Sequence, residues 1–403
     1  MNSRINTGVD RSSASNRELR RFAIVAPNFF PRVCGIGDHS LRLGAELQRR
    51  LHSVDLFSRE PATTHPEAPE LRVHGVKGSL PMAIAQNIAS AIAEMRPTDV
   101  ILQYTSQMWD TWRFGSPALP FLAARARQAG ARVTLIAHEP FVPWYRRPDL
   151  FLGALLQRAQ FAALIKSTDS VFVTTETRRP NVAPYCRALN LAPPGVSRVG
   201  ANALPLERAV RSNGRVSGQS GPRLGIFSTA GVGKRFDVVL DAFARVTREL
   251  PSAELVLIGD LGPSESPAVK EVHHALSRHP ARERIRLTGR LSLAEIAAEI
   301  AALDVYLFPM NTGANTRSCT LPVALGSGLP VVAVLGSETD VGLFRDGENV
   351  VFARELSGAS FADATLRLVR DPSLLVRVAD GARRLYDDHL TWKRIADALL
   401  AEI

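Results

Sequence analysis

The sequence of 403 residues has only three cysteines, few aromatic residues and no long apolar run. Cys34, Cys186 and Cys319 lie far apart, without the spacing of metal ligands. An odd number of cysteines without a secretory signal favours reduced thiols and a cytoplasmic location. Apolar stretches such as residues 161–165 are interrupted by charges well short of a bilayer span. We therefore expect a soluble protein without a disulfide framework, a zinc site or a transmembrane helix.

Acidic residues are outnumbered, since 39 Asp and Glu stand against 49 Lys and Arg, which gives a net charge of +10. Such an excess attracts nucleic acid, an anionic membrane or phosphorylated small molecules. The basic residues are scattered and do not interleave with aromatic residues, so we expect no dedicated nucleic-acid binding. Residues 1–20 are polar and rich in arginine, which predicts a disordered basic tail.

The length and the pattern of apolar residues both indicate two domains. In each half of the chain, short β-type runs alternate with helical patterns, which predicts a parallel sheet covered by helices on both faces. A stretch rich in Gly and Ser, 211–222, interrupts this alternation. We predict an α/β protein with a first domain over 21–205, a linker over 206–222, a second domain over 223–385, and a C-terminal helix over 386–403 that packs back on the first domain.

Ligands of open parallel sheets bind beyond the carboxyl ends of the strands, so the loops after the strands are the places to search. The first such loop, 27–39, contains Gly35 and Gly37, which allow positive φ angles and a close approach of a ligand to the backbone. A dinucleotide fingerprint needs a third small residue where Ser40 stands, which argues against nicotinamide binding. A plain glycine turn is the alternative.

A second loop follows the predicted strand 132–137 and opens with His138 and Glu139, with Trp144 and Tyr145 close behind. These side chains suit a hydrogen-bonding sugar site. A histidine with a purely structural role is the alternative for His138.

A third loop, 227–235, reads FSTAGVGKR and resembles a phosphate loop. The glycines are too close together and Arg235 stands where a nucleotide hydrolase needs Ser or Thr, which argues against an NTPase. A glycine turn, a helix start and the adjacent cations Lys234 and Arg235 still form a competent diphosphate site.

The fourth loop, 311–320, reads NTGANTRSCT and leads into a predicted helix over 321–327. The free N–H groups at the start of this helix, the helix dipole, Arg317 and the hydroxyls of Ser318 and Thr320 would form an anion-binding cradle made mostly of backbone. Simple capping by Ser318 or Thr320 would account for one residue of this polar run but not for all of it.

Several stretches, in their order along the chain, resemble the GT-B glycosyltransferases of the large retaining family four. The similar stretches are CGIGDHSLRLGAEL, GKRFDVVLDAFARV, AELVLIGD, IRLTGRLSLAEIAAEIAALDVYLFP, ALGSGLPVVAV with LFRDGENVVF, and TWKRIADALL near the end. VILQYTSQMW and VTLIAHEPFVPW resemble a bacterial subgroup of that family. The resemblance covers most of residues 22–400 and implies two Rossmann-like domains with a cleft between them.

The resemblance implies transfer of a sugar, with retention and without a metal or other cofactor, from a nucleoside diphosphate donor to an acceptor. Lys234 would bind the diphosphate with Arg317, and His138 would lie beside the transferred sugar, which makes these three residues the catalytic candidates. Gly289 and Arg290 would border the nucleobase. The other donor-side candidates are Gly35, Gly37, Thr229, Gly231, Arg235, Asn315, Ser318, Cys319 and Thr320, and the acceptor-side candidates are Asp38, Glu139 and Trp144.

One departure from the family concerns its two glutamates, which have seven residues between them and whose places fall on Asn315 and Val323. Recognition of the sugar and of the ribose must therefore differ. A non-catalytic sugar-nucleotide-binding protein and an epimerase on the same fold remain alternatives. The choice among UDP, GDP and ADP, the acceptor and the oligomeric state stay open.

A membrane-associated, lipid-linked or otherwise anionic acceptor is a further hypothesis. It rests on Arg42, Arg49 and Arg50 in one predicted helix, together with Arg20 and Arg21. A solvated helix face is the alternative.

Overall fold

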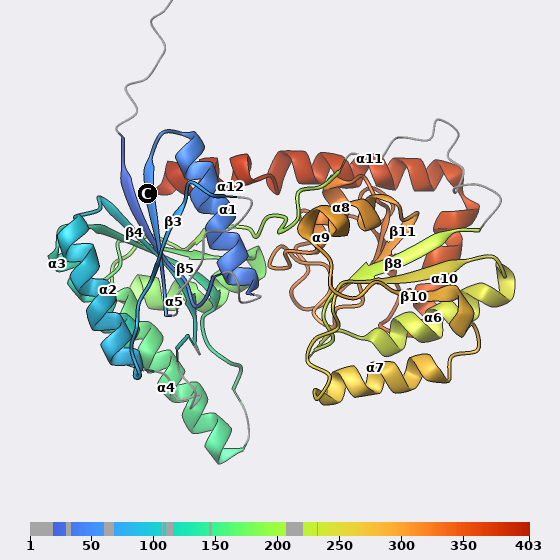
Figure 1. Ribbon diagram of the computed structural model, residues 1–403, viewed down its shortest axis with the longest axis horizontal. Helices are drawn as coiled ribbons and strands as arrows, with labels where there is room; N and C mark the ends of the chain where they lie inside the picture. Colours follow the sequence, from blue (N-terminus) through green and yellow to red (C-terminus); the bar gives the residue numbers. More distant parts are fainter. Residues whose placement is uncertain are drawn as a thin grey trace, which may run out of the picture.

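The computed structural model describes residues 19–29, 34–59, 68–106, 108–109, 116–144, 147–206, 221–231 and 233–403. Most of the predicted tail (1–20) and most of the predicted linker (206–222) lie outside the described residues. The described chain forms two α/β domains, drawn at the left and right of Figure 1. The predicted fold class, two Rossmann-like domains with parallel sheets, is confirmed.

The first domain contains, among the described residues, a seven-stranded sheet in the order β3-β2-β1-β4-β5-β6-β7, with every pair parallel. Its strands are β1 (Arg21–Val25), β2 (Ser53–Ser58), β3 (Arg72–Gly75), β4 (Asp99–Thr105), β5 (Arg132–Glu139), β6 (Ser170–Val173) and β7 (Gly195–Val196). Strands β1 and β4 are neighbours although they are far apart in sequence, so the strand order reverses there. Ligands of such sheets bind at this switch point.

Helices cover both faces of the first sheet. One face packs against α2 (Pro81–Met95), α3 (Ala118–Gln128), α4 (Pro148–Ile165) and α5 (Arg179–Ala188), and the short helix η1 (Glu176–Arg178) precedes α5. The other face packs against α1 (Gly35–Arg49) and α12 (Trp392–Glu402). The C-terminal helix α12 thus completes the core of the first domain.

The second domain contains, within the described chain, a six-stranded parallel sheet in the order β10-β9-β8-β11-β12-β13. Its strands are β8 (Arg223–Phe227), β9 (Glu254–Ile258), β10 (Ile285–Leu287), β11 (Val305–Leu307), β12 (Val331–Val334) and β13 (Val351–Ala353). The order reverses between β8 and β11. The loops after these two strands are the third and fourth loops of the sequence analysis, so the fold brings them together.

Two apolar clusters flank the second sheet. One contains residues of α6 (Phe236–Glu249), α7 (Pro267–Ser277) and α10 (Gly358–Arg370), and the other contains residues of α8 (Leu293–Ala301), α9 (Leu321–Gly326) and α11 (Pro372–His389). A short helix, η2 (Arg282–Arg284), leads into β10. Within the described residues, no helix combines the length and apolarity needed to cross a membrane.

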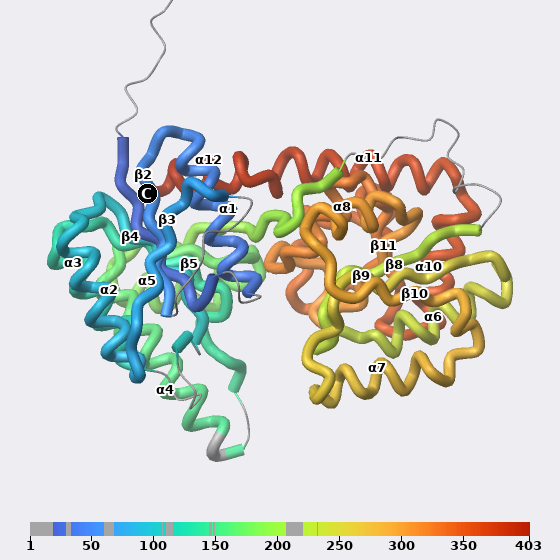
Figure 2. The backbone as a smooth tube through the Cα atoms, viewed as in Figure 1, coloured from blue at the N-terminus to red at the C-terminus, as the bar shows by residue number. Residues whose placement is uncertain are grey.

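Two segments join the domains along one side of the molecule, the green chain before residue 206 and the red helices α11 and α12 (Figure 2). The segment predicted as one C-terminal helix over 386–403 contains the end of one helix and all of another, because α11 ends at His389 and the Thr391 side chain caps α12. Trp392 anchors the second helix, since its Nε1 donates to the Ala201 carbonyl at 2.9 Å and only 6% of the residue is exposed. This hydrogen bond therefore joins the two connecting segments to each other.

The basic surface proposed from the sequence on α1 is not formed. Arg42 is buried and bonds the Asn202 carbonyl at 3.0 Å, while Arg50 is 11% exposed and bonds both Glu46 and Asp397. Arg49 is exposed but pairs with Glu46 as well. The face of α1 that carries Arg42 and Arg50 packs inside the protein, so these residues do not support binding of anionic lipid.

Candidate functional site

The first glycine loop forms the start of a helix instead of a turn. Helix α1 begins at Gly35, earlier than predicted, and the Cys34 sulfur accepts a hydrogen bond from the Gly37 amide at 3.4 Å. Neither glycine has a positive φ, so that part of the prediction is wrong, while the close approach of a ligand to the backbone stays a prediction. Space is the reason at Gly37, where an added Cβ would lie 2.1 Å from the Asn28 carbonyl oxygen. The resulting helix N-terminus presents its positive end to the region beyond β1.

The lysine loop lies against the loop that follows β11. Lys234 and Met310 form an isolated bridge, and the Asn311 amide donates to the Gly233 carbonyl at 3.0 Å. Gly233 has a φ of +81°, which side chains rarely adopt, and an added Cβ would meet the Asn311 amide oxygen at 2.7 Å. Glycine is therefore required here on both conformational and steric grounds.

Lys234 is partly buried, and its Nζ donates to the Thr229 hydroxyl at 2.9 Å. Burial lowers the pKa of Lys234, the neighbouring Cys319 thiol raises it and the positive charge of Arg317 lowers it further. Among the described residues, the charged groups behind this shift are Cys319 and Arg317, and neither is a carboxylate. The ammonium group is thus placed for an anion that the protein itself does not supply.

Gly231 and Arg235, the two other candidate residues of the lysine loop, have different surroundings. An added Cβ at Gly231 would meet nothing within 4 Å, so the backbone is open at this point. The guanidinium of Arg235 turns away to Asp237 at 2.5 Å, where both side chains are exposed. The hydrogen bond from Arg235 lowers the pKa of Asp237, so this cation already has a partner. The structure does not bring the Arg235 charge to Lys234.

The loop 311–320 is not helical, and the side chain of its Cys319 lies near the first domain. An added Cβ at Gly35 would lie 3.7 Å from the Cys319 sulfur. Burial is the main cause that raises the pKa of the Cys319 thiol to about 12, and Asp38 raises it while Lys234 lowers it. The start of α1, Cys319 and Lys234 therefore meet at one place between the domains.

The cradle predicted at the start of α9 is weaker than expected. Helix α9 has only six residues, and Thr320 makes no capping bond with its side chain. Two amides of the loop are already used, because Arg317 donates to the Asn315 side chain at 3.3 Å and Thr320 donates to the Ser318 hydroxyl at 3.4 Å. The loop thus offers fewer free N–H groups than the sequence suggested, although α9 lies within one residue of its predicted bounds.

Asn315 holds its own loop. It is 1% exposed, and its amide nitrogen donates to the Gly313 carbonyl at 2.8 Å and the Thr312 hydroxyl at 3.3 Å. Ser318 and Thr320 share a hydrogen bond of 3.1 Å between their hydroxyls. The side-chain amide of Asn315, which stands in the place of one of the family's glutamates, therefore bonds its own loop in this structure.

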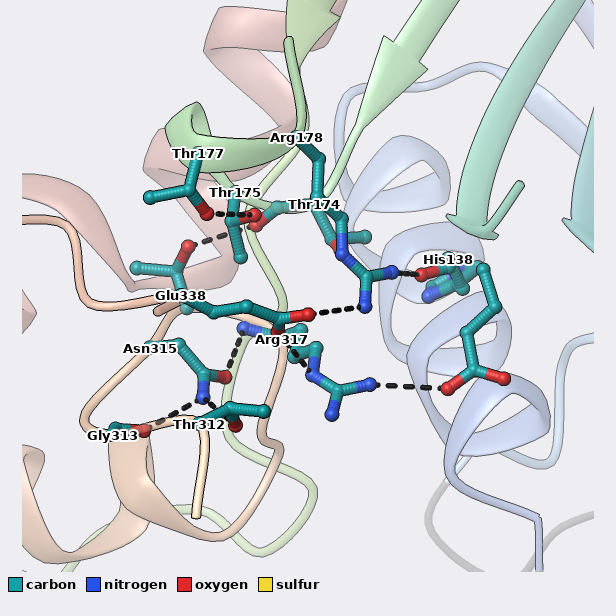
Figure 3. Close-up of polar contacts among 12 residues, drawn as sticks. His138, Thr174, Thr175, Thr177, Arg178, Thr312, Gly313, Asn315, Arg317 and Glu338 are labelled. Atoms are coloured by element: carbon teal, nitrogen blue, oxygen red, sulfur yellow. Dashed lines mark hydrogen bonds and ion pairs between the residues drawn. The ribbon is translucent and has the colours of Figure 1, made fainter. Parts of the chain in front are cut away.

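Arg317 lies at the centre of a chain of ion pairs that crosses between the domains (Figure 3). Its Nη1 donates to Glu139 at 3.0 Å in the first domain, and its Nε lies 2.8 Å from Glu338 in the second. Glu338 in turn pairs with Arg178 of the first domain at 2.8 Å. Arg178 also donates to the carbonyl oxygen of His138. Two positive and two negative charges thus balance one another across the boundary.

His138 is near the end of β5 and 8% exposed, with its Nε2 at 2.7 Å from the Gln103 amide oxygen. Burial is the first cause that lowers the pKa of His138, followed by the charges of His39 and Arg178. The rings of His138 and His39 lie 5.2 Å apart, edge to face. These surroundings favour a neutral imidazole at His138.

His39 of α1 was missed by the sequence analysis. Its ring packs between His138 and Trp392, each 5.2 Å away, and within the described chain neither ring nitrogen has a hydrogen-bond partner. Burial lowers the pKa of His39 to about 4. No sequence signal marked it, because the residues that enclose it are distant in the chain.

The lowered pKa of His39 predicts a loss of stability in acid. The unfolded chain takes up this proton near pH 6.5 and the folded protein only near pH 4, so the free energy of unfolding falls as the pH drops through this window. The full effect is roughly 3 kcal/mol. We expect His39→Phe to flatten the dependence by a large part of this amount, measured by urea unfolding between pH 5 and 7. An unchanged slope would contradict the assignment.

Gly289 and Arg290, two further candidate residues, follow strand β10. Gly289 has a φ of +69° and forms a bridge with Gly259, while Arg290 is exposed. The Ala230 amide of the lysine loop donates to the Leu261 carbonyl at 2.7 Å. Gly289 is therefore linked to the lysine loop through the turn after β9.

Trp144 lies on an exposed apolar patch. It is 53% exposed and stacks on Phe151 at 5.0 Å, with the Arg158 guanidinium 3.8 Å from its ring. The patch continues along α4 with Leu152, Leu155 and Leu156, where the helix projects from the first domain (Figure 1). The structure thus places Trp144 on a projecting surface, whereas Glu139 contacts Arg317 directly.

Residues 221–371 match the family profile "Glycosyl transferases group 1". A search of curated protein sequences found no match.

Solved structures show the fold of the whole chain. HepE of Anabaena in complex with UDP is similar with a TM-score of 0.69 and 15% identity, covering 95% of this chain and 99% of its own. Sucrose-phosphate synthase of Thermosynechococcus elongatus is similar with a TM-score of 0.69 and 15% identity, covering 95% and 98%. The expected GT-B fold is thereby confirmed, and the residues that match the group 1 profile lie in the second domain.

Proposed function

We propose that the protein is a glycosyltransferase that moves a sugar from a nucleoside diphosphate donor to an acceptor, with retention and without a metal ion. The observation that carries the proposal is the meeting of Lys234, Arg317 and the start of α1 between the two domains. The likeness to structures bound to UDP and to UDP-glucose makes UDP the first donor nucleotide to test, with GDP and ADP as alternatives.

The chemistry follows from the charges at this place. Departure of a nucleoside diphosphate leaves negative charge on its terminal phosphate, and fixed cations in a partly closed cleft stabilise that charge. Lys234 would meet the diphosphate with its ammonium group, the N-terminus of α1 would add its dipole, and Arg317 would border the same site. His138 and Glu139, at the end of β5, would lie on the side of the transferred sugar and the acceptor.

One observation favours a second candidate, a non-catalytic sugar-nucleotide-binding protein. Arg317 is already paired with Glu139 and Glu338, and Asn315 is engaged within its own loop. An assay that follows release of the nucleoside diphosphate from labelled UDP-, GDP- and ADP-sugars, with and without candidate acceptors, separates the two. Release from at least one donor supports the transferase, and tight binding without release supports the alternative.

The two glycines of the first loop provide a paired prediction. Gly37→Ala forces a methyl group into the Asn28 carbonyl, so we expect a loss of about 2 kcal/mol or more in the free energy of unfolding. Gly35→Ala makes only an ordinary contact with Cys319, so stability should stay near the wild type while nucleotide binding weakens. Thermal melting with and without UDP measures both effects. Equal behaviour of the two variants would contradict these roles.

A further inference from the structure

Glu338 and Arg178, which the sequence analysis did not single out, form the part of the ion-pair chain that follows Arg317 (Figure 3). Each is largely enclosed, with side-chain exposures of 20% and 13%. Arg178 Nη2 donates a hydrogen bond to one oxygen of Glu338, and Arg317 Nε lies beside the other oxygen as an ion pair without hydrogen-bond geometry, each at 2.8 Å. Such enclosed, doubly paired charges are more strongly coupled than exposed surface pairs.

The loop that carries Glu338 is fixed to the loop that carries Arg317. The Glu338 amide donates to the Thr312 carbonyl at 3.0 Å. Gly313 has a φ of +80°, and an added Cβ would lie 2.2 Å from the Thr339 hydroxyl. The two loops therefore pack as one unit, and the carboxylate of Glu338 has little freedom to move relative to Arg317.

Arg178 joins this unit to the first domain. It lies at the end of η1, directly after β6, and donates to the His138 carbonyl and to Glu338. A second hydrogen bond joins the two domains nearby, because the Thr316 hydroxyl donates to the Thr174 backbone carbonyl at 2.8 Å. The position of Arg317 is thus set by both domains together.

Arg317 uses its Nε and Nη1 on carboxylates, and Figure 3 draws no contact from its remaining nitrogen. Its positive charge acts on Lys234 and lowers the pKa of that lysine. The guanidinium is therefore held on two sides while it stays close enough to affect the lysine at the centre of the site.

We propose that Glu338 and Arg178 are positioning residues of the donor site, which hold the Arg317 guanidinium beside Lys234 only while the two domains are joined as in this structure. The inference rests on the proposed function, since it assigns these residues to the diphosphate part of the same site. Neither residue needs to touch the donor. A phosphate held in part by Arg317 is bound less well when that side chain is released.

The test compares affinities for a nucleoside diphosphate and its monophosphate by calorimetry at 25 °C. UDP with UMP is the first pair, followed by GDP with GMP and ADP with AMP. We expect Glu338→Gln and Arg178→Met each to lower the diphosphate-to-monophosphate affinity ratio, by roughly tenfold. The double variant should lose little more than either single variant, because the two residues act through one chain.

Glu299→Gln is the matched control, because it removes a carboxylate from an ion pair of 2.6 Å that lies within the second domain. It should leave the ratio unchanged. A general loss of structure would weaken both nucleotides alike, so the ratio separates positioning from folding. An unchanged ratio in Glu338→Gln, with normal binding by the wild type, overturns the inference alone. Failure of the wild type to bind any of the three diphosphates overturns the proposed function and the inference with it.

Discussion

Lys234→Ala is expected to abolish the stabilisation that a nucleoside diphosphate gives to the wild-type protein. The ammonium group bonds Thr229, and the groups whose charges shift its pKa in the described part of the chain, Cys319 and Arg317, are not carboxylates. A diphosphate is therefore its natural counter-ion, and loss of one such charged contact in an enclosed site typically costs about 2–5 kcal/mol. We expect the affinity for the best of UDP, GDP and ADP to fall about a hundredfold, with the thermal shift vanishing accordingly.

Arg235→Ala is the control for this change. It removes the adjacent positive charge, but the guanidinium of Arg235 is exposed and already bonded to Asp237. We expect its nucleotide affinity to stay within about threefold of the wild type, as is usual for exposed surface pairs. A response of Lys234→Ala equal to that of the wild type would remove Lys234 from the site. A large loss in Arg235→Ala would show that the side chain leaves Asp237 when the ligand binds.

Trp392→Ala is expected to give the largest loss of stability among the substitutions considered. The side chain belongs to the core of the first domain, although it begins the last helix of the chain. It fills the space above Gly200, where an added Cβ would lie 2.7 Å from the indole, and its Nε1 bonds the Ala201 carbonyl. Removal of a buried tryptophan typically costs about 3–5 kcal/mol.

Urea unfolding of the full chain measures this loss, and the transition of the first domain is the one that should move. Trp144→Ala is the matched control, because that tryptophan is 53% exposed and should change the free energy of unfolding by about 1 kcal/mol at most. Similar losses in the two variants would contradict a structural role for α12 in the first domain. The result matters for function because the same helix covers His39, which contacts His138.

The sequence predicted the fold class because each half alternates apolar strands with helical patterns. It missed elements whose signal is weak. Strand β3 is a half-exposed edge of four residues, and helix α5 carries Pro180 and Pro184, which argue against a helix when the sequence is read alone. The break at Leu390 and Thr391 was also missed, because no glycine or proline marks it.

The candidate site was predicted in part for the same physical reason. Lys234 and the loop 311–320 follow strands at the switch point of their sheet, and local patterns identify such loops. Glu338 also follows a strand, β12, and the same rule would have found it had that loop been examined. Its pairing with Arg178 joins residues 160 positions apart, and no local pattern encodes such a contact.

The hydrogen bonds and ion pairs of a candidate residue were harder to predict from the sequence than its position in the fold. Arg317 was expected as a free cation, yet Glu139 and Glu338 balance its charge. Asn315 was expected to face a ligand, yet it is buried and bonded to its own loop. Both outcomes depend on which side chains the packed domains bring together, which spacing along one chain does not determine.

A crystal structure of the full chain with the nucleoside diphosphate that stabilises it most would test the central claim directly. The account predicts the diphosphate between the two domains, in contact with the Lys234 ammonium group and facing the start of α1 at Gly35. A nucleotide bound away from Lys234, or held by one domain without approach to the first-domain helix, would contradict it.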